Sequence, residues 1–163
     1  MTLQERLDFG KGLSRQLSAD GLKVVYVASG TALSSATTDE GGIIVEHGAY
    51  WSAVRSLDEA RYLTAVLNSG IIVPRIVSMQ PRGAGGPRHF DKLVWELRVP
   101  EFNGGQPLHR QLSDAAVEAE RAAGLVELRE GAYFTTQRRA IRDALESGIA
   151  AAIDALVTRL LDR

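Results

Sequence analysis

The sequence predicts an α+β fold, with a small mixed β-sheet packed against helices and a long helix at the C-terminal end. Three observations lead to this prediction. Residues 22–28 are β-branched and aromatic, as in a buried strand, whereas residues 56–68 and 108–123 repeat apolar side chains at helical spacing. The chain has 163 residues, 45% of them apolar and 24% charged, which is enough for a core without disulfides.

Four segments are expected to form the sheet. The first, 22–28, lies between glycines, which commonly bound strands. Residues 43–46 follow a turn cluster, and residues 50–55 alternate in polarity, so we expect these two to pair through the tight turn at 47–48. Residues 97–99 predict a brief fourth strand.

The helix at 56–68 has the clearest local signals. Ser56 and Glu59 form a capping box, in which the serine hydroxyl accepts from the third helical N–H and the glutamate reaches back. The sequence Asn-Ser-Gly at 68–70 is expected to end the helix through a left-handed residue. One face of the helix is apolar, and its two leucines are expected to be buried; that face carries Ala60, Leu63, Val66 and Leu67.

Two shorter helical segments separate this helix from the next long one. Pro74 favours a helix that begins near Val73, because proline fits the first helical turn. Residues 90–95 predict a short helical turn. The second long helix, 108–123, is expected to end at Gly124.

The last stretch, from about residue 135 to the end, predicts one amphipathic helix of nearly 30 residues. Its apolar residues recur at spacings of 4, 4, 4, 3 and 4 from Ile141 to Leu160, with Gly148 as a weak point that costs about 1 kcal/mol relative to Ala. This helix either packs on the preceding helix or serves as a spacer in a larger protein.

The chain divides into three parts on these patterns. Residues 1–21 are polar and rich in Gly and Ser, which indicates a partly ordered lead-in at the cut end of a larger protein. Residues 22–123 form the α+β domain, and residues 124–163 form the C-terminal helical segment.

The composition argues against several classes of site. The absence of cysteine excludes a disulfide framework, a thiolate zinc site and a cysteine nucleophile. The three histidines lie far apart in sequence, and no Gly-x-Ser-x-Gly elbow or nucleotide P-loop is present, so no metal and no cofactor is expected. No apolar run has the length of a membrane span, and the first ten residues carry charges where a signal peptide is apolar. We therefore expect a cytoplasmic protein that does not bind membranes.

The charge distribution identifies one basic segment. The whole chain carries 19 basic and 20 acidic side chains, a net charge of −1, but residues 75–98 carry five basic and only two acidic ones. A glycine-rich loop lies within this segment. Arg binds phosphate or a guanine edge and Gln binds an adenine edge, so a nucleic-acid interface is indicated there. The candidate binding residues are Arg75, Gln80, Arg82, Arg88, His89 and Lys92.

Two simpler interpretations stand beside this one. Small basic patches are common on solvated surfaces, and the glycine-rich loop is equally suited to a flexible connector. The two tryptophans, Trp51 and Trp95, have apolar neighbours and are expected to pack in the core rather than to stack on bases.

An ordered set of motifs resembles one known family. The string DEARYLTAVLNS at 58–69 resembles the EA-x-YL-x-x-LLNS helix in the C-terminal target-recognition region of bacterial adenine-N6 DNA methyltransferases, and type I specificity subunits have a related helix. Residues 80–92 and 97–102 are similar to that family's Q-x-RG…G-x-RH…K…LPIP-x-F segment, and residues 108–120 to the helix that follows it. The likeness covers about residues 22–123. It implies double-stranded DNA as one partner and a catalytic methyltransferase domain, in cis or in trans, as another.

The departures from the family pattern decide what the resemblance implies. The catalytic Asn/Asp-Pro-Pro-Tyr/Phe/Trp tetrapeptide and the glycine-rich S-adenosylmethionine motif are absent from this sequence, and Arg98 stands where the family often has proline. The resemblance therefore implies a non-catalytic, DNA-binding target-recognition domain of a restriction-modification or phage-defence methyltransferase. The alternatives are a protein-interaction or structural module that uses the C-terminal helix, with degenerate DNA contacts, and a stand-alone enzyme.

Overall fold

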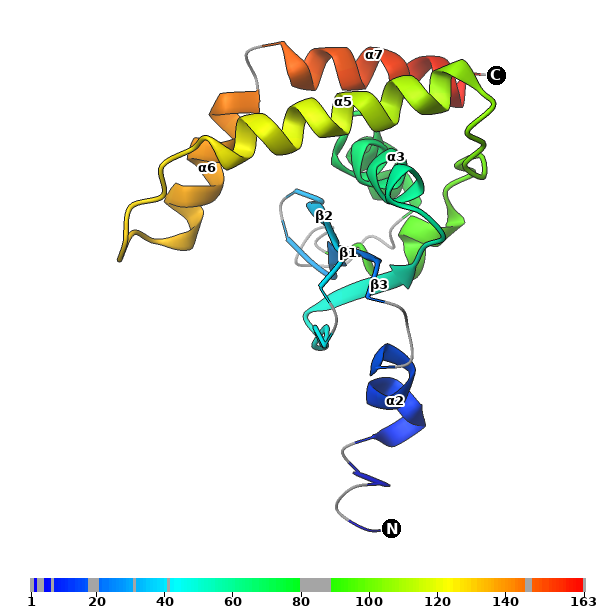
Figure 1. Cartoon of the computed structure of the whole chain (residues 1–163), viewed down its shortest axis with the longest axis vertical. Helices are drawn as coiled ribbons and strands as arrows, with labels where there is room; N and C mark the ends of the chain where they lie inside the picture. The colour runs from blue at the N-terminus through cyan, green and yellow to red at the C-terminus, as the bar shows by residue number, and fades with distance from the viewer. Residues whose placement is uncertain are drawn as a thin grey trace.

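The computed structural model is an α+β fold built in layers (Figure 1). A three-stranded sheet lies against α3, and α5 and α7 run side by side on the other side of α3. The structure describes residues 2, 5–6, 8–17, 21–30, 32–40, 42–79, 89–145 and 148–162. The elements are η1 (Phe9–Lys11), α2 (Gly12–Leu17), β1 (Lys23–Val27), β2 (Ser35–Thr38), β3 (Ala49–Ala53), α3 (Leu57–Asn68), α4 (Ile72–Met79), η2 (Asp91–Glu96), α5 (Pro107–Gly124), α6 (Phe134–Leu145) and α7 (Ile149–Leu161).

The central strand of the sheet is β1, which pairs antiparallel with β2 on one side and with β3 on the other. Val24 and Tyr26 point to the same face of β1, because side chains alternate along a strand, and both belong to the core. The strands expected at 22–28 and 50–55 are confirmed at β1 and β3. The sheet is antiparallel, however, so the expectation of a mixed sheet is wrong.

The prediction of a strand at 43–46 is also wrong, and β2 takes its place in the sheet. The side-chain amide of Gln16 pairs with the backbone of Val45, donating to its carbonyl at 3.0 Å and accepting from its N–H at 2.5 Å. Lys23 Nζ donates to the Ile43 carbonyl at 3.2 Å. Because side chains satisfy these backbone groups, the segment needs no strand partner. Consequently β3 pairs with β1, not with 43–46.

The segment 97–99 forms no strand. Its chain is extended at Leu97, and the Val99 N–H bonds to the Leu97 carbonyl at 2.8 Å, inside the segment itself. Proline at position 100 has no N–H for a ladder, and its carbonyl accepts the Tyr62 hydroxyl at 2.8 Å. A side chain of α3, rather than a neighbouring strand, therefore holds this segment in place.

The long helix α3 confirms the capping box with one change. The Ser56 hydroxyl accepts the Glu59 N–H at 3.1 Å, but the Glu59 carboxylate accepts the N–H of Arg55 at 2.7 Å, one residue before the cap. Of the two leucines expected in the core, Leu67 is buried and Leu63 is only half-buried. The helix ends at an extended Ser69, not at a left-handed residue.

The shorter helices agree with expectation. Pro74 lies in the first turn of α4, and η2 spans the predicted helical turn at 90–95. The prediction of a second long helix is confirmed by α5. No single helix of the described residues is long and apolar enough to cross a membrane, although α3 and α4 reach that length and composition as a pair bent by 69°.

The prediction of a single C-terminal helix is wrong, because the stretch forms two helices, α6 and α7. Gly148, just before α7, has φ of 123°, a conformation that residues with a side chain rarely adopt, so the chain turns there although the apolar spacing continues. The stripe of α7 packs on α5 and belongs to the core through Ile153, Val157 and Leu160. Of the two roles left open for the C-terminal stretch, α7 takes packing on the preceding helix.

Candidate nucleic-acid interface

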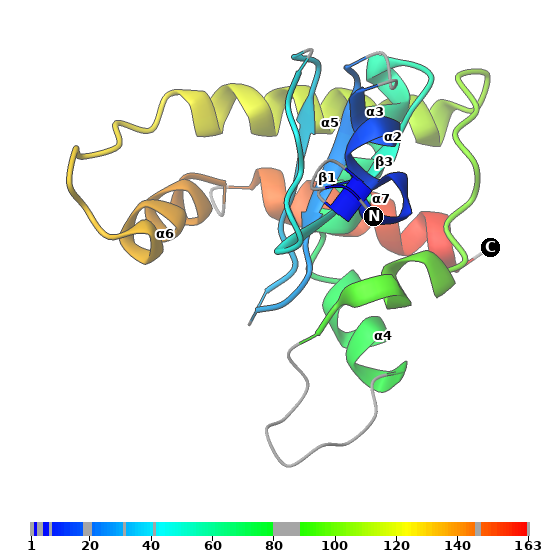
Figure 2. The ribbon, with the colours of Figure 1, turned by 90° about the horizontal axis from the view of Figure 1, so that it is seen from below.

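Two short helices position the described part of the predicted interface. Arg75 lies on α4, Lys92 lies on η2, and His89 comes just before η2. The other three candidates, Gln80, Arg82 and Arg88, lie outside the described residues. Figure 2 shows α4 and η2 next to one another at the edge of the molecule, so the two helices at the ends of the basic segment lie close together.

The orientation of α4 follows from its apolar face. Ile72 and Ile76, one turn apart, are fully buried in the core, which leaves Arg75 on the exposed side. Its guanidinium contacts the Asp162 carboxylate at 3.5 Å. Both side chains are exposed, and an exposed pair at this distance contributes little, so Arg75 is available to a stronger anionic partner.

Phe90 attaches the described segment before η2 to the core. Its N–H donates to the Ala28 carbonyl at 2.8 Å, and its side chain is buried. One residue earlier, His89 forms a β-bridge with Ser29 and is exposed. The turn that follows β1 therefore anchors the C-terminal side of the basic segment.

The helix η2 presents a cation and an aromatic ring on one face. Residues three apart superimpose along a 3₁₀-helix, which places Lys92 and Trp95 together, and both are exposed. The side chain of Lys92 forms no hydrogen bond or ion pair within the described part of the chain. Val94 points the other way, into the core.

The exposure of Trp95 corrects the expectation that both tryptophans pack in the core. Trp95 is 49% exposed and meets Tyr26 edge-on, with ring centroids 5.6 Å apart. Trp51 is half-buried, and Lys23 Nζ lies 5.8 Å from its ring centroid. The spacing of three between Lys92 and Trp95 is the sequence signal that would have placed Trp95 at the interface.

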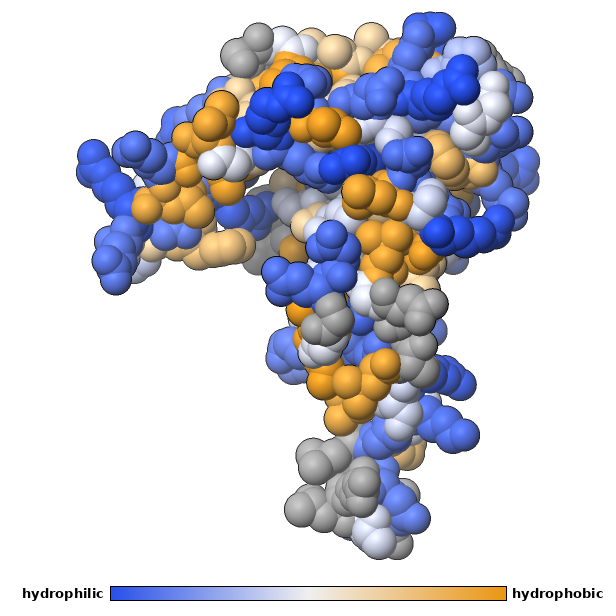
Figure 3. Space-filling view, viewed as in Figure 1, coloured by the Kyte–Doolittle hydropathy of each residue, from blue (hydrophilic) through white to orange (hydrophobic). Residues whose placement is uncertain are grey.

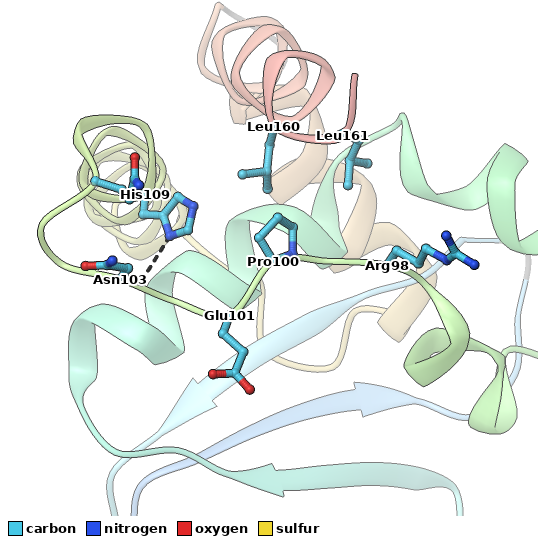
Figure 4. Close-up of a pocket in the computed structure, with 8 residues that line it drawn as sticks. Arg98, Pro100, Glu101, Asn103, His109, Leu160 and Leu161 are labelled. Atoms are coloured by element: carbon cyan, nitrogen blue, oxygen red, sulfur yellow. Dashed lines mark hydrogen bonds between the residues drawn. The ribbon is translucent and has the colours of Figure 1, made fainter. Parts of the chain in front are cut away.

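A concavity of about 430 Å³ lies between the segment before α5 and the end of α7 (Figure 4). His109 and Leu160 converge on Pro100, whereas Arg98 and Glu101 point away from one another. The Asn103 N–H donates to Nδ1 of the buried His109 at 3.0 Å. These contacts hold the segment against α5, so the residues that line the concavity have a structural role and we do not assign it as a binding site.

The aromatic ring beneath this segment is also structural. Tyr62 stacks on His109, with ring centroids 4.8 Å apart, and lies 5.5 Å from the ring of Phe102. Burial raises the pKa of Tyr62 from its ordinary 10 to about 12, and the protonated hydroxyl donates to the Pro100 carbonyl. Elsewhere in the described residues, no group of three or more His, Asp or Glu side chains is placed to hold a metal ion.

Comparison with known proteins identifies no relative of this chain. No family model, no curated protein and no solved structure matches this chain.

Proposed function

We propose that this chain is a DNA-binding target-recognition domain of a restriction-modification or phage-defence adenine-N6 methyltransferase and is itself non-catalytic. One observation carries the proposal: the described parts of the motifs that resemble this family are separate in sequence but belong to one packed unit. The motif at 58–69 forms the central helix α3, and the motif at 97–102 packs on it through Tyr62. The motif at 80–92 starts from the exposed end of α4 and ends on η2.

In this proposal, recognition and chemistry are divided between two domains. The chain reads double-stranded DNA, and a catalytic methyltransferase domain, in cis or in trans, takes the target adenine out of the stack and methylates it. No residue of this chain is assigned a catalytic role or a cofactor. The proposal accordingly predicts neither S-adenosylmethionine binding nor methylation by this chain alone.

The contacts proposed for the interface follow from the chemistry of the side chains. Lys92 and Arg75 are exposed cations that suit phosphate, and Trp95 beside Lys92 offers an aromatic face for a sugar or an unstacked base. Arg82, Arg88 and Gln80 have the donor geometry that reads guanine and adenine edges in the major groove. Phosphate contacts position the domain, and base contacts select the sequence.

A protein-interaction module is the second candidate, and one observation favours it. The apolar stripe of α7 is covered by α5, so it offers no binding surface. The connection between α5 and α6, together with the start of α6, instead exposes four large side chains: Leu125, Leu128, Tyr133 and Phe134.

Selection from a randomised duplex pool tests target recognition directly. The chain is incubated with the pool, bound duplexes are recovered and sequenced over several rounds, and the enriched sequence is compared with the starting pool. We expect one enriched sequence that contains an adenine. Salt-dependent binding without any enriched sequence would contradict target recognition and leave only general DNA affinity.

A further inference from the structure

A second basic segment lies far along the chain from the first. Residues 128–142 carry four arginines and one acidic residue, Glu130, which is an excess of three positive charges. This equals the excess of residues 75–98, although the C-terminal part of the chain as a whole is acidic. The arginines are Arg129, Arg138, Arg139 and Arg142.

Three of these arginines belong to α6, which also carries Asp143 and so has an excess of two positive charges. The helix contacts α5 but buries none of its side chains completely. Arg139 and Arg142 are three residues apart, so they are neighbours on one helical face, and both are exposed. The side chain of Arg142 has no hydrogen bond or ion pair to the described residues. Arg139 has one contact, to Asp143 at 3.9 Å between exposed side chains, which contributes little.

One turn connects α6 to the first basic segment. Arg138 Nη2 donates to the Ser34 hydroxyl at 2.9 Å, at the end of the turn that follows β1. At the start of the same turn, Ser29 bridges to His89, three residues before Lys92. Figure 2 shows this turn between α6 on one side and α4 with η2 on the other. The two basic segments therefore flank a single turn.

Aromatic side chains accompany the arginines. Tyr133 and Phe134, at the start of α6, are 84% and 69% exposed, and the Arg138 guanidinium lies 5.6 Å from the Phe134 ring. Figure 3 shows apolar atoms next to hydrophilic ones over α6. The half-buried Arg138 beside the exposed Phe134 ring is similar to the pairing of Lys92 and Trp95 on η2, and the exposed Arg139 and Arg142 lie on the same helix. This combination suits a nucleic-acid backbone better than a purely apolar protein surface.

We infer that α6 is a second DNA-contacting element, in which Arg139 and Arg142 bind backbone phosphates of the same duplex that Lys92 contacts. The inference rests on the proposed function, because it needs a duplex to be bound. Cationic side chains on both sides of the turn then hold the duplex at two separate points. Two points of contact fix its orientation, which one basic loop does not do.

The test compares duplex affinity over a range of salt for the parent chain and for R139Q/R142Q, by fluorescence anisotropy. Both side chains are exposed and carry no described contact to the core, so the variant is expected to keep the parent's thermal unfolding. R55Q/R110Q is the matched control, because it removes two exposed arginines from the starts of α3 and α5. We expect the α6 variant to lower the slope of log affinity against log salt by about 1.8, two phosphate contacts at about 0.9 each, and the control to leave it unchanged.

The outcomes separate this inference from the proposed function. If the parent and K92A differ in salt slope but the α6 variant matches the parent, α6 is not a DNA contact and the proposed function stands. If the α6 variant and R55Q/R110Q lower the slope equally, the loss of any two positive charges has the same effect, and the inference fails. If the parent shows no salt-dependent binding, both fail.

Discussion

Tyr62→Phe tests the packing that joins the motif helix α3 to the segment before α5. Tyr62 is fully buried, and its hydroxyl donates to the Pro100 carbonyl at 2.8 Å. A typical intramolecular hydrogen bond contributes about 1 kcal/mol, so the variant should unfold about 1 kcal/mol more easily at neutral pH. The ring contacts with Phe102 and His109 remain, which limits the effect to the hydroxyl.

The same substitution predicts a difference in pH dependence. The pKa of Tyr62 is about 12 in the folded chain against an ordinary 10, so above pH 10 the unfolded chain loses this proton first. The unfolded state then binds fewer protons than the folded state, and the contribution of Tyr62 to stability falls as pH rises from about 10 to about 12. One pKa unit corresponds to about 1.4 kcal/mol, so the advantage of the parent over Tyr62→Phe should disappear within about one pH unit above 10.

Urea unfolding followed by circular dichroism measures both effects, at about pH 8 and at several values above 10. Tyr133→Phe is the matched control, because Tyr133 is exposed and should show neither effect. An equal stability of parent and Tyr62→Phe at about pH 8, or a difference between them that stays constant above pH 10, would refute the reasoning.

Two further predictions concern the core and the break between the last helices. Leu67→Ala should lower the free energy of unfolding in urea by about 2–4 kcal/mol, because Leu67 is buried. Leu63→Ala should lower it by less than half as much, because Leu63 is half-buried. Equal losses would mean that the buried face of α3 is not the one described. Gly148→Ala should destabilise the fold by about 1–3 kcal/mol, because φ of 123° strains a residue with a side chain. If the substitution instead stabilised the fold by about 1 kcal/mol, as replacing a glycine inside a helix by alanine does, α6 and α7 would be one continuous helix.

Local signals predicted the elements whose causes are local. The capping residues and apolar spacing of α3 lie within the helix itself, and Pro74 acts within the first turn of α4. The sequence could not show that Gln16, 29 residues away, would satisfy the backbone of Val45 and leave 43–46 without a strand. The strand β2 was missed because its sequence, Ser-Ala-Thr-Thr, carries almost no apolar pattern.

The other errors have the same origin in tertiary contacts. Apolar spacing continues across Gly148, so the sequence pattern does not show that this glycine takes φ of 123° and that α7 turns back to pack against α5. The proximity of α4 and η2, which carry Arg75 and Lys92, was predictable in part, because the two helices are close in sequence. That α6 lies across the turn after β1 from them was not, since it depends on a contact between Ser34 and Arg138.

The central claim, that the basic segment binds duplex DNA, is tested most directly by salt-dependent anisotropy of the parent and of R82A/R88A/K92A. The variant leaves the described core untouched, and R55A/R110A/R121A removes the same charge from exposed positions elsewhere. We predict weaker binding to every duplex and a salt slope reduced by about 0.9 for each phosphate that the variant no longer binds, up to about 2.7 for the three side chains together. A parent that binds duplex DNA with the same affinity and the same slope as R82A/R88A/K92A would contradict the account.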